Sequence, residues 1–274
     1  DLNNLYAEGW REPECFTVKA ADEETDLYGV MWKPMDFDST KRYPVIAYVY
    51  PGPWTEYIPL DFEFSSPSGA PQLAQLGFVV VCFGNRGGSP YRGRDYHCYG
   101  YGNLRDYPLA DNKYGLEQLI ARYSFIDGTK VGIFGHSGGG SMSVAAICTY
   151  PDFYKAAVAS SGNYDNTIFD YGWSEIHHGI KEVTKEGKVS FEFSIPVHLE
   201  LAKNLKGHLM LVTGDADDTV NPANTSRMVH SLILAGKDFE LVVLPGQRHG
   251  YMGLAKEYYF RKMWRHFERY LLDE

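Results

Sequence analysis

The sequence predicts a single α/β domain built on a mostly parallel β-sheet that helices cover on both faces. Two observations predict this fold class. Apolar runs of strand length alternate with amphipathic runs of helix length from residue 43 to the end of the chain. Several of the strand-like runs, such as 77–83, are apolar throughout, which is typical of strands buried on both faces of a parallel sheet. The 274 residues can form one large core, and no repeat or linker divides them.

The expected elements follow one another in a regular order. Residues 15–19 and 25–32 are two predicted strands joined by an acidic turn. The later predicted strands are 43–50, 77–83, 130–134, 156–160, 208–213 and 239–244, and the predicted helices are 71–76, 109–123, 141–148, 196–205, 222–235 and 254–272. Residues 84–103 are predicted to form a loop, and residues 162–194 interrupt the alternation.

Composition limits the classes of partner. The net charge is −9, and nucleic-acid binding depends on clustered positive charge, so no nucleic-acid partner is expected. No apolar run approaches the roughly 20 residues of a membrane-spanning helix. The four cysteines form no closely spaced pairs of the kind that bind metals, and they indicate no disulfide framework. We therefore expect neither a membrane span nor a metal site.

A serine lies at the apex of a glycine-rich turn, in the segment Gly135-His136-Ser137-Gly138-Gly139. An apolar, β-branched run precedes this turn and a small-residue helix follows it. Glycine on either side of a serine permits a sharp, strained strand-to-helix turn that exposes the hydroxyl as a nucleophile. An ordinary glycine-rich turn would fit the same five residues, so the rest of the chain has to decide between the two interpretations.

An acid and a base follow later predicted strands. The strand 208–213 ends in a loop with Asp215, Asp217 and Asp218, and the strand 239–244 ends in a loop with His249. Serine, aspartate and histidine thus occur in the chain order of an α/β-hydrolase triad, in which the imidazole takes the serine proton and a carboxylate orients the imidazole. Local sequence does not decide which of the three aspartates has that role.

The tetrahedral intermediate of such a reaction also needs donors for its oxyanion. The backbone N–H of Gly138, directly after the nucleophile, is expected to be one of them. The other is expected from the loop after the strand 43–50, which carries two prolines and few N–H groups. The phenol of Tyr50 could donate instead, or it could be a core tyrosine at the end of a strand.

These motifs resemble the catalytic domain of the prolyl oligopeptidase family of serine peptidases, and most closely its dipeptidyl peptidase IV branch. The resemblance covers nearly the whole chain. It rests on Val49-Tyr50-Pro51-Gly52-Pro53, Asn85-Arg86-Gly87-Gly88-Ser89, Gly135-His136-Ser137-Gly138-Gly139, Gly214-Asp215-Ala216-Asp217-Asp218-Thr219-Val220 and His249-Gly250. Five ordered motifs are far more specific than any one of them.

The resemblance implies roles for individual residues. Ser137, Asp217 and His249 would form the triad, and Tyr50 would complete the oxyanion hole with Gly138. Phe169 and Trp173 would form the aromatic walls of the pocket for the substrate residue before the cleaved bond (P1), with Val220 contributing from the acid loop. Gly138 stands where the branch has an aromatic residue, so the pocket would be more open. Thr219 stands where relatives carry an asparagine or arginine that holds a substrate carbonyl, and threonine reaches less far.

The resemblance also implies an activity and a context. The expected function is a dipeptidyl aminopeptidase that acts on peptides through an acyl-enzyme after proline or alanine, without cofactor or metal. An esterase or acylaminoacyl hydrolase is the alternative on the same scaffold, and a non-catalytic binding module is a third. Members of the family carry a β-propeller ahead of this domain, so residues 1–14 are interpreted as the tail of such a domain. A homodimer and a periplasmic or secreted location in a bacterium are further expectations.

Overall fold

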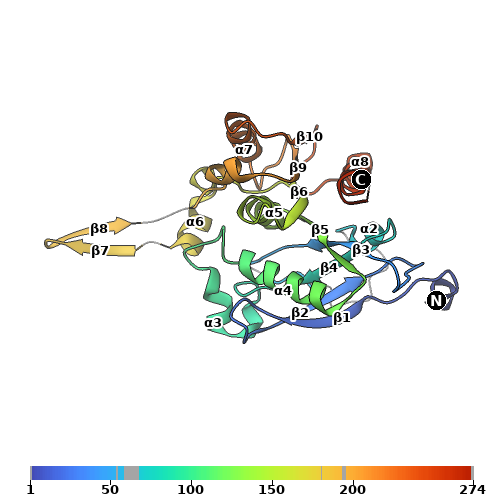
Figure 1. Cartoon of the computed structure of the whole chain (residues 1–274). Coiled ribbons are helices and arrows are strands. Elements are labelled where there is room, and N and C mark those ends of the chain that lie inside the picture. The colour runs from blue at the N-terminus through green and yellow to red at the C-terminus, as the bar shows by residue number, and fades with distance from the viewer. Residues whose placement is uncertain (1, 54, 59–67, 180, 193–195, 273–274) are drawn as a thin grey trace.

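The predicted sheet is present in the computed structural model, which describes residues 2–53, 55–58, 68–179, 181–192 and 196–272 (Figure 1). Its eight strands have the order β1-β2-β4-β3-β5-β6-β9-β10. They are β1 Glu14–Lys19, β2 Asp26–Trp32, β3 Tyr43–Tyr48, β4 Val79–Phe83, β5 Ile126–His136, β6 Tyr154–Ser160, β9 His208–Gly214 and β10 Glu240–Leu244. Strands β1, β2 and β4 pair antiparallel, and every pair from β4 across to β10 is parallel. The predicted fold class is confirmed.

Helices cover both faces of this sheet (Figure 1). The α-helices of the described residues are α1 Leu2–Ala7, α2 Ala70–Ala74, α3 Arg94–His97, α4 Leu109–Arg122, α5 Gly138–Thr149, α6 Tyr171–His178, α7 Ala223–Leu234 and α8 Gly253–Phe267. Helices α4, α5 and α7 pack in one apolar core through Leu116, Ile147 and Met228, respectively. Helices α2 and α8 pack in a second apolar core on the other face through Leu73 and Met263, respectively. All five side chains are fully buried, and each burial stabilises the fold by about 1.5–3 kcal/mol.

Some predicted bounds were wrong. The strand expected at 43–50 ends at Tyr48, before the proline-containing turn. The helix expected at 196–205 is a short 3₁₀ helix, Leu199–Asn204, and so short a segment favours the tighter turn. The helix expected at 254–272 ends as an α-helix at Phe267 and continues as a π-helical turn.

Two stretches without predicted elements contain regular structure. The expected loop 84–103 includes α3, and the stretch 162–194 includes α6 and a hairpin of β7 Lys181–Lys185 and β8 Lys188–Glu192. The hairpin extends away from the rest of the chain (Figure 1). Its side chains are mostly exposed, so the strands lack the apolar alternation by which a half-buried strand is recognised.

The topology brings distant parts of the chain to one edge of the sheet. Strands β5, β6, β9 and β10 are consecutive neighbours and run parallel, so the loops that follow them lie side by side. In open α/β sheets this carboxyl edge is where ligands bind. Within the part of the chain that the structure describes, every helix is too short or too polar to cross a bilayer.

Candidate active site

Ser137 lies between the end of β5 and the first residue of α5 and has a strained backbone. Its φ is 58° and its ψ is −122°. L-residues other than glycine rarely adopt positive φ, and such strain is concentrated at functional sites. The N–H of Ser137 donates to the carbonyl of Ser160 on the neighbouring strand at 2.8 Å, which anchors the turn. The geometry is that of a nucleophile elbow rather than an ordinary glycine turn.

The glycines around Ser137 are required to different degrees. A Cβ on Gly139 would lie 2.1 Å from the carbonyl oxygen of Val49, and one on Gly135 would lie 2.5 Å from the same oxygen. A Cβ on Gly140 would lie 2.4 Å from the carbonyl oxygen of Ser160. These distances are too short for any side chain. Gly138 differs, because its Cβ would meet nothing closer than 3.6 Å and its backbone does not need positive φ.

His249, in the loop after β10, is hydrogen-bonded to Asp217, in the loop after β9. The imidazole Nδ1 lies 2.9 Å from Oδ2 and 3.1 Å from Oδ1 of the carboxylate. The other two aspartates of the acid loop have different partners: Asp215 accepts from the Gly246 N–H, and Asp218 pairs with an arginine. The side chain of Asp217 is fully buried, whereas that of His249 is about one-fifth exposed (21%). A buried acid behind a partly exposed base is the arrangement that fixes an imidazole tautomer.

The surroundings of Asp217 favour its ionised form. Burial alone raises the pKa of a carboxyl, but hydrogen bonds from His249 and the Val220 N–H outweigh it, so the pKa of Asp217 is lowered. The Oδ1 atom also accepts from the N–H groups of Thr219 and Val220 at 3.0 and 2.9 Å. Asp217 is therefore a carboxylate above acidic pH and acts only as an acceptor.

Ser137 and His249 line one pocket of about 360 Å³. The other lining residues include the five remaining predicted site residues, Tyr50, Gly138, Phe169, Trp173 and Val220, together with Thr219 and Asn163. In the described residues the Ser137 hydroxyl makes no hydrogen bond to His249, and in enzymes without substrate this contact is often long. The structure brings all eight predicted side chains or backbones to one place.

Tyr50 is the second residue after β3 and lines the same pocket as Ser137. Burial raises the pKa of its phenol, which therefore remains a hydrogen-bond donor. The loop is anchored at Pro51. Its carbonyl oxygen accepts hydrogen bonds from the hydroxyl of Tyr107 at 2.8 Å and from the side-chain amide of Asn85 at 3.2 Å. This fixed loop and the first N–H groups of α5, which lack intrahelical partners, can hold an oxyanion between them.

The aromatic wall comes from the stretch that interrupts the predicted alternation. Phe169 and Trp173 pack edge to face, with ring centroids 6.0 Å apart. Trp173 lies in the first turn of α6, where the side chain of Asp170 caps the helix by accepting from the Trp173 N–H at 2.8 Å. Capping fixes where the helix begins and therefore where the indole is presented.

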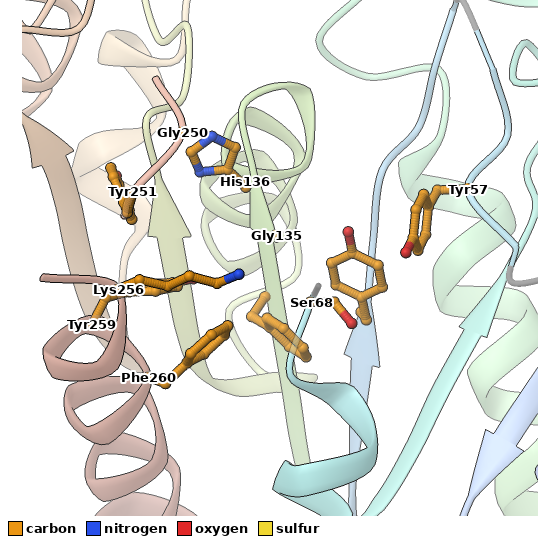
Figure 2. Close-up of a pocket in the computed structure, with 11 residues that line it drawn as sticks. Tyr57, Ser68, Gly135, His136, Gly250, Tyr251, Lys256, Tyr259 and Phe260 are labelled. Carbon is orange, nitrogen blue, oxygen red and sulfur yellow. The ribbon is translucent and has the colours of Figure 1, made fainter. Parts of the chain in front are cut away.

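Three side chains near the triad were not predicted as site residues from the sequence. His136, the residue before Ser137, lies with its ring centroid 4.7 Å from that of His249. Its pKa is lowered to about 4, chiefly by burial. Ser161 follows β6 and Tyr251 follows His249, and their hydroxyls are 2.9 Å apart. His136 and Tyr251 also line a second pocket of about 310 Å³, which Figure 2 shows. The signal that could have indicated these residues is their position: His136 and Tyr251 lie within two residues of a predicted triad residue, and Ser161 follows a predicted strand.

Comparison with known proteins agrees with the geometry. A model of the prolyl oligopeptidase family (Peptidase_S9) matches residues 64–274, more than half of the chain. The chain belongs to the prolyl oligopeptidase family. The resemblance drawn from the five motifs is thus confirmed, and so is the α/β-hydrolase fold that it implied.

Relatives include dipeptidyl peptidase 8 of Homo sapiens, which is 31% identical over 86% of this chain, and prolyl endopeptidase FAP of Bos taurus, which is 26% identical over 88%. A Bacteroides ovatus protein assigned as a dipeptidyl aminopeptidase IV has a similar solved structure, with 29% identity and a TM-score of 0.86 over 96% of this chain. Dipeptidyl peptidase 4 of Porphyromonas gingivalis shares the fold, with 24% identity, a TM-score of 0.84 and 98% of this chain covered. The chain spans 26% and 31% of the two curated relatives and 37% of each solved chain.

Proposed function

We propose that this chain is the catalytic part of a serine dipeptidyl aminopeptidase. One observation carries the proposal: the strained Ser137 and His249, whose imidazole is hydrogen-bonded to the buried Asp217, line the same pocket as Tyr50. Membership of a peptidase family and relatives that are named dipeptidyl peptidases support the choice of a peptide substrate.

The proposed reaction uses an acyl-enzyme. The Ser137 hydroxyl attacks the peptide carbonyl carbon while the imidazole of His249 takes its proton, and Asp217 stabilises the imidazolium. The oxyanion is held by the Gly138 N–H and the Tyr50 phenol. When the C–N bond breaks, the imidazolium gives the proton to the leaving amine. Water then attacks the acyl-enzyme by the same route and restores Ser137.

The pocket beside Ser137 is proposed to receive the P1 side chain. Its walls are the rings of Phe169 and Trp173 with Val220, and they suit a compact apolar residue such as proline or alanine. Because no side chain projects from Gly138, the pocket has room for larger P1 residues as well.

Recognition of the peptide's free amino terminus is proposed to depend on a further domain of the full-length protein. The solved relatives are longer than this chain, which spans 37% of each, and their additional length supports such a domain. A β-propeller, export to the periplasm or outside of a bacterial cell, and a homodimer remain expectations from the family likeness.

The function is tested with the full-length protein and three amides or esters. Gly-Pro-anilide, its N-acetylated form and a short acyl ester are compared, and a fluorophosphonate is used to label the nucleophile. We expect hydrolysis of the free-amino anilide, loss of activity on acetylation, and labelling that disappears in Ser137→Ala. Ester cleavage without amide cleavage would favour the esterase. A folded protein that neither hydrolyses these substrates nor is labelled would favour a binding module.

A further inference from the structure

The Asn-Arg-Gly-Gly-Ser motif of residues 85–89 lies against the loop that carries Tyr50. Strands β3 and β4 are parallel neighbours, so the loops that follow them lie side by side. A Cβ on Gly52 would lie 3.0 Å from the Cα of Gly88 and 3.1 Å from its carbonyl oxygen, which shows how closely the two backbones approach. Among the described residues that line the pocket of Ser137, none belongs to the motif. An effect of the motif on the reaction would therefore act through the loop of Tyr50.

The side chain of Asn85 holds the carbonyl of the residue that follows Tyr50. Its amide nitrogen Nδ2 donates to the carbonyl oxygen of Pro51 at 3.2 Å and to that of Arg86 at 2.8 Å. The hydroxyl of Tyr107 donates to the same Pro51 oxygen at 2.8 Å. Asn85 and Tyr107 are both buried, so water does not compete for these bonds. A carbonyl oxygen has two lone pairs, and here each has a buried donor.

The backbone of Asn85 is itself fixed by hydrogen bonds. Its N–H donates to Oε1 of Glu56 at 3.1 Å, and its carbonyl accepts from the N–H of Gly88 at 3.1 Å. The same carboxylate oxygen of Glu56 accepts from the hydroxyl of Tyr96. The carbonyl of Tyr96 accepts from the N–H of Gly87 at 2.7 Å, which closes the network around the motif. The amide of Asn85 therefore has a defined position from which to hold its partner.

Tyr50 consequently lies between two anchored neighbours. The N–H of Val49 donates to the carbonyl of Phe134 at 2.9 Å, which ties the residue before Tyr50 to β5. The carbonyl of Pro51 is held by the two buried donors on the other side. A Cβ on Gly138 would lie 3.8 Å from the ring of Tyr50, so the phenol ring stands close to the residue whose N–H is the other oxyanion donor. A donor stabilises an oxyanion best when it is fixed in advance where the charge develops.

We propose that Asn85 is a positioning residue of the active site, because its side-chain amide fixes the loop that places the Tyr50 phenol. It acts at the Pro51 carbonyl, with the hydroxyl of Tyr107 as the second donor. The proposal rests on the function proposed above and on the role of Tyr50 in it. Asn85 touches neither substrate nor reacting atoms, and it acts on the oxyanion donor rather than on the triad.

Two variants of the full-length protein remove the donors one at a time. Asn85→Leu replaces the amide with an apolar side chain of similar size, and Tyr107→Phe removes only the second donor. Asn85→Leu should lower kcat about tenfold and leave KM within about twofold, because the phenol is held less well while the pocket walls are unchanged. Tyr107→Phe should also lower kcat, and it provides the test if Asn85→Leu does not fold. A buried acceptor loses a donor in both variants, so kcat is measured where urea unfolding shows each to be fully folded.

A second background gives a readout that a merely structural role would not move. In Tyr50→Phe the phenol hydroxyl is absent, so the position of the ring no longer affects the oxyanion. The double variant of Tyr50→Phe with Asn85→Leu should therefore keep the kcat of Tyr50→Phe alone, within about twofold. A general distortion of the site would instead lower kcat about tenfold in both backgrounds.

Tyr154→Phe is the matched control for Tyr107→Phe. Tyr154 is fully buried, and its hydroxyl donates to Oδ1 of Asn112 at 2.8 Å, the same length as the bond from Tyr107 to Pro51. It is the first residue of β6, so it lies at the opposite edge of the sheet from the loops of the site. The change removes one buried hydroxyl of the same kind from a place outside the Tyr50 loop. Tyr154→Phe should lower stability in urea unfolding but keep the wild-type kcat.

The outcomes separate this inference from the proposed function. If the wild type is labelled by a fluorophosphonate and Asn85→Leu keeps the wild-type kcat, the positioning role is refuted and the triad stands. An equal fold loss of kcat from Asn85→Leu in the wild-type and Tyr50→Phe backgrounds would refute the role as well. So would a loss of kcat in Tyr154→Phe as large as that in Tyr107→Phe. If the wild type is neither labelled nor active, the function itself is wrong and this inference falls with it.

Discussion

Replacement of Gly138 separates the glycine that shapes the pocket from the glycines that shape the elbow. A Cβ at position 138 would lie 3.6 Å from the carbonyl oxygen of Gly52 and 3.8 Å from the ring of Tyr50, which are ordinary contacts. A Cβ at position 139 would lie 2.1 Å from the carbonyl oxygen of Val49, which belongs to the backbone and cannot give way. Gly138→Ala and Gly139→Ala therefore add the same methyl group one residue apart with opposite steric outcomes.

These distances set the expected magnitudes. Gly138→Ala should leave the free energy of unfolding unchanged or raise it by about 0.5 kcal/mol, because alanine restricts the unfolded chain and disturbs nothing in the fold. Gly139→Ala should lower it by about 1–3 kcal/mol or more, as overpacking does. The new methyl at 138 would also stand in the pocket beside Tyr50. Excluding one methylene from such a pocket costs about 1–3 kcal/mol, so kcat/KM for bulky P1 residues should fall about tenfold or more.

The assay combines urea unfolding with a panel of dipeptide anilides that differ only at P1. Proline and alanine substrates should keep wild-type kcat/KM within a few-fold in Gly138→Ala, since the backbone N–H that holds the oxyanion is retained. Leucine and phenylalanine substrates should lose activity, and Gly138→Tyr should enlarge that loss. Equal losses for all P1 residues would show that position 138 acts on the chemistry rather than on pocket size. Destabilisation of Gly138→Ala equal to that of Gly139→Ala would refute the steric reasoning itself.

Three further predictions concern the oxyanion, the acid and pH. Tyr50→Phe should lower kcat about 10²–10³-fold with little change in KM, as loss of an oxyanion donor does; an unchanged kcat would remove the phenol from the mechanism. Asp217→Asn should lower kcat about 10⁴-fold. Asp215→Asn and Asp218→Asn are the matched controls and should keep most activity, because these two carboxylates have other hydrogen-bond partners than His249. A similar loss of kcat in either control would contradict the assignment of Asp217 as the acid. The free energy of unfolding should decrease as pH falls from 6.5 to 4, because burial lowers the pKa of His198 to about 4 and only the unfolded chain takes up a proton in that window. The pKa of His198 is about 2.5 units lower in the folded than in the unfolded chain, which corresponds to at most about 3 kcal/mol of unfolding free energy. Urea unfolding at several pH values measures this change, and His198→Asn should reduce the slope of unfolding free energy against pH. An equal slope in that variant would exclude His198 as a source.

The sequence was sufficient for the fold class and for the places where chemistry could occur. Apolar runs of strand length fixed the parallel sheet, and loops after such strands had to meet at one edge. Ser137 and His249 each follow such a strand, so their meeting at that edge could be predicted from the sequence. The same reasoning left three aspartates open, because Asp215, Asp217 and Asp218 follow the same strand within four residues. Their partners decide between them, and those partners come from a loop about 30 residues further on.

The remaining features depend on contacts that no local pattern encodes. The hairpin of β7 and β8 is exposed on both faces, so its strands carry no apolar alternation. The strain at Ser161 cannot be recognised from a serine that follows a predicted strand, since nothing in the residue type requires positive φ. Glycine content is equally ambiguous. The segment 138–140 has three glycines in a row, and only the packed backbone shows that Gly138 is the one with free space.

The order of the strands explains why β6 matters although it carries no triad residue. Ser137, Asp217 and His249 follow β5, β9 and β10, and β6 is the strand inserted between the first of these and the other two. Hydrogen bonds that connect the nucleophile side of the site to the acid side through the sheet therefore involve the end of β6. Ser160 and Ser161 occupy that end, and their backbone and hydroxyl groups bond in both directions. The order of the strands therefore identifies the end of β6 as the place where the two sides of the site are held in register.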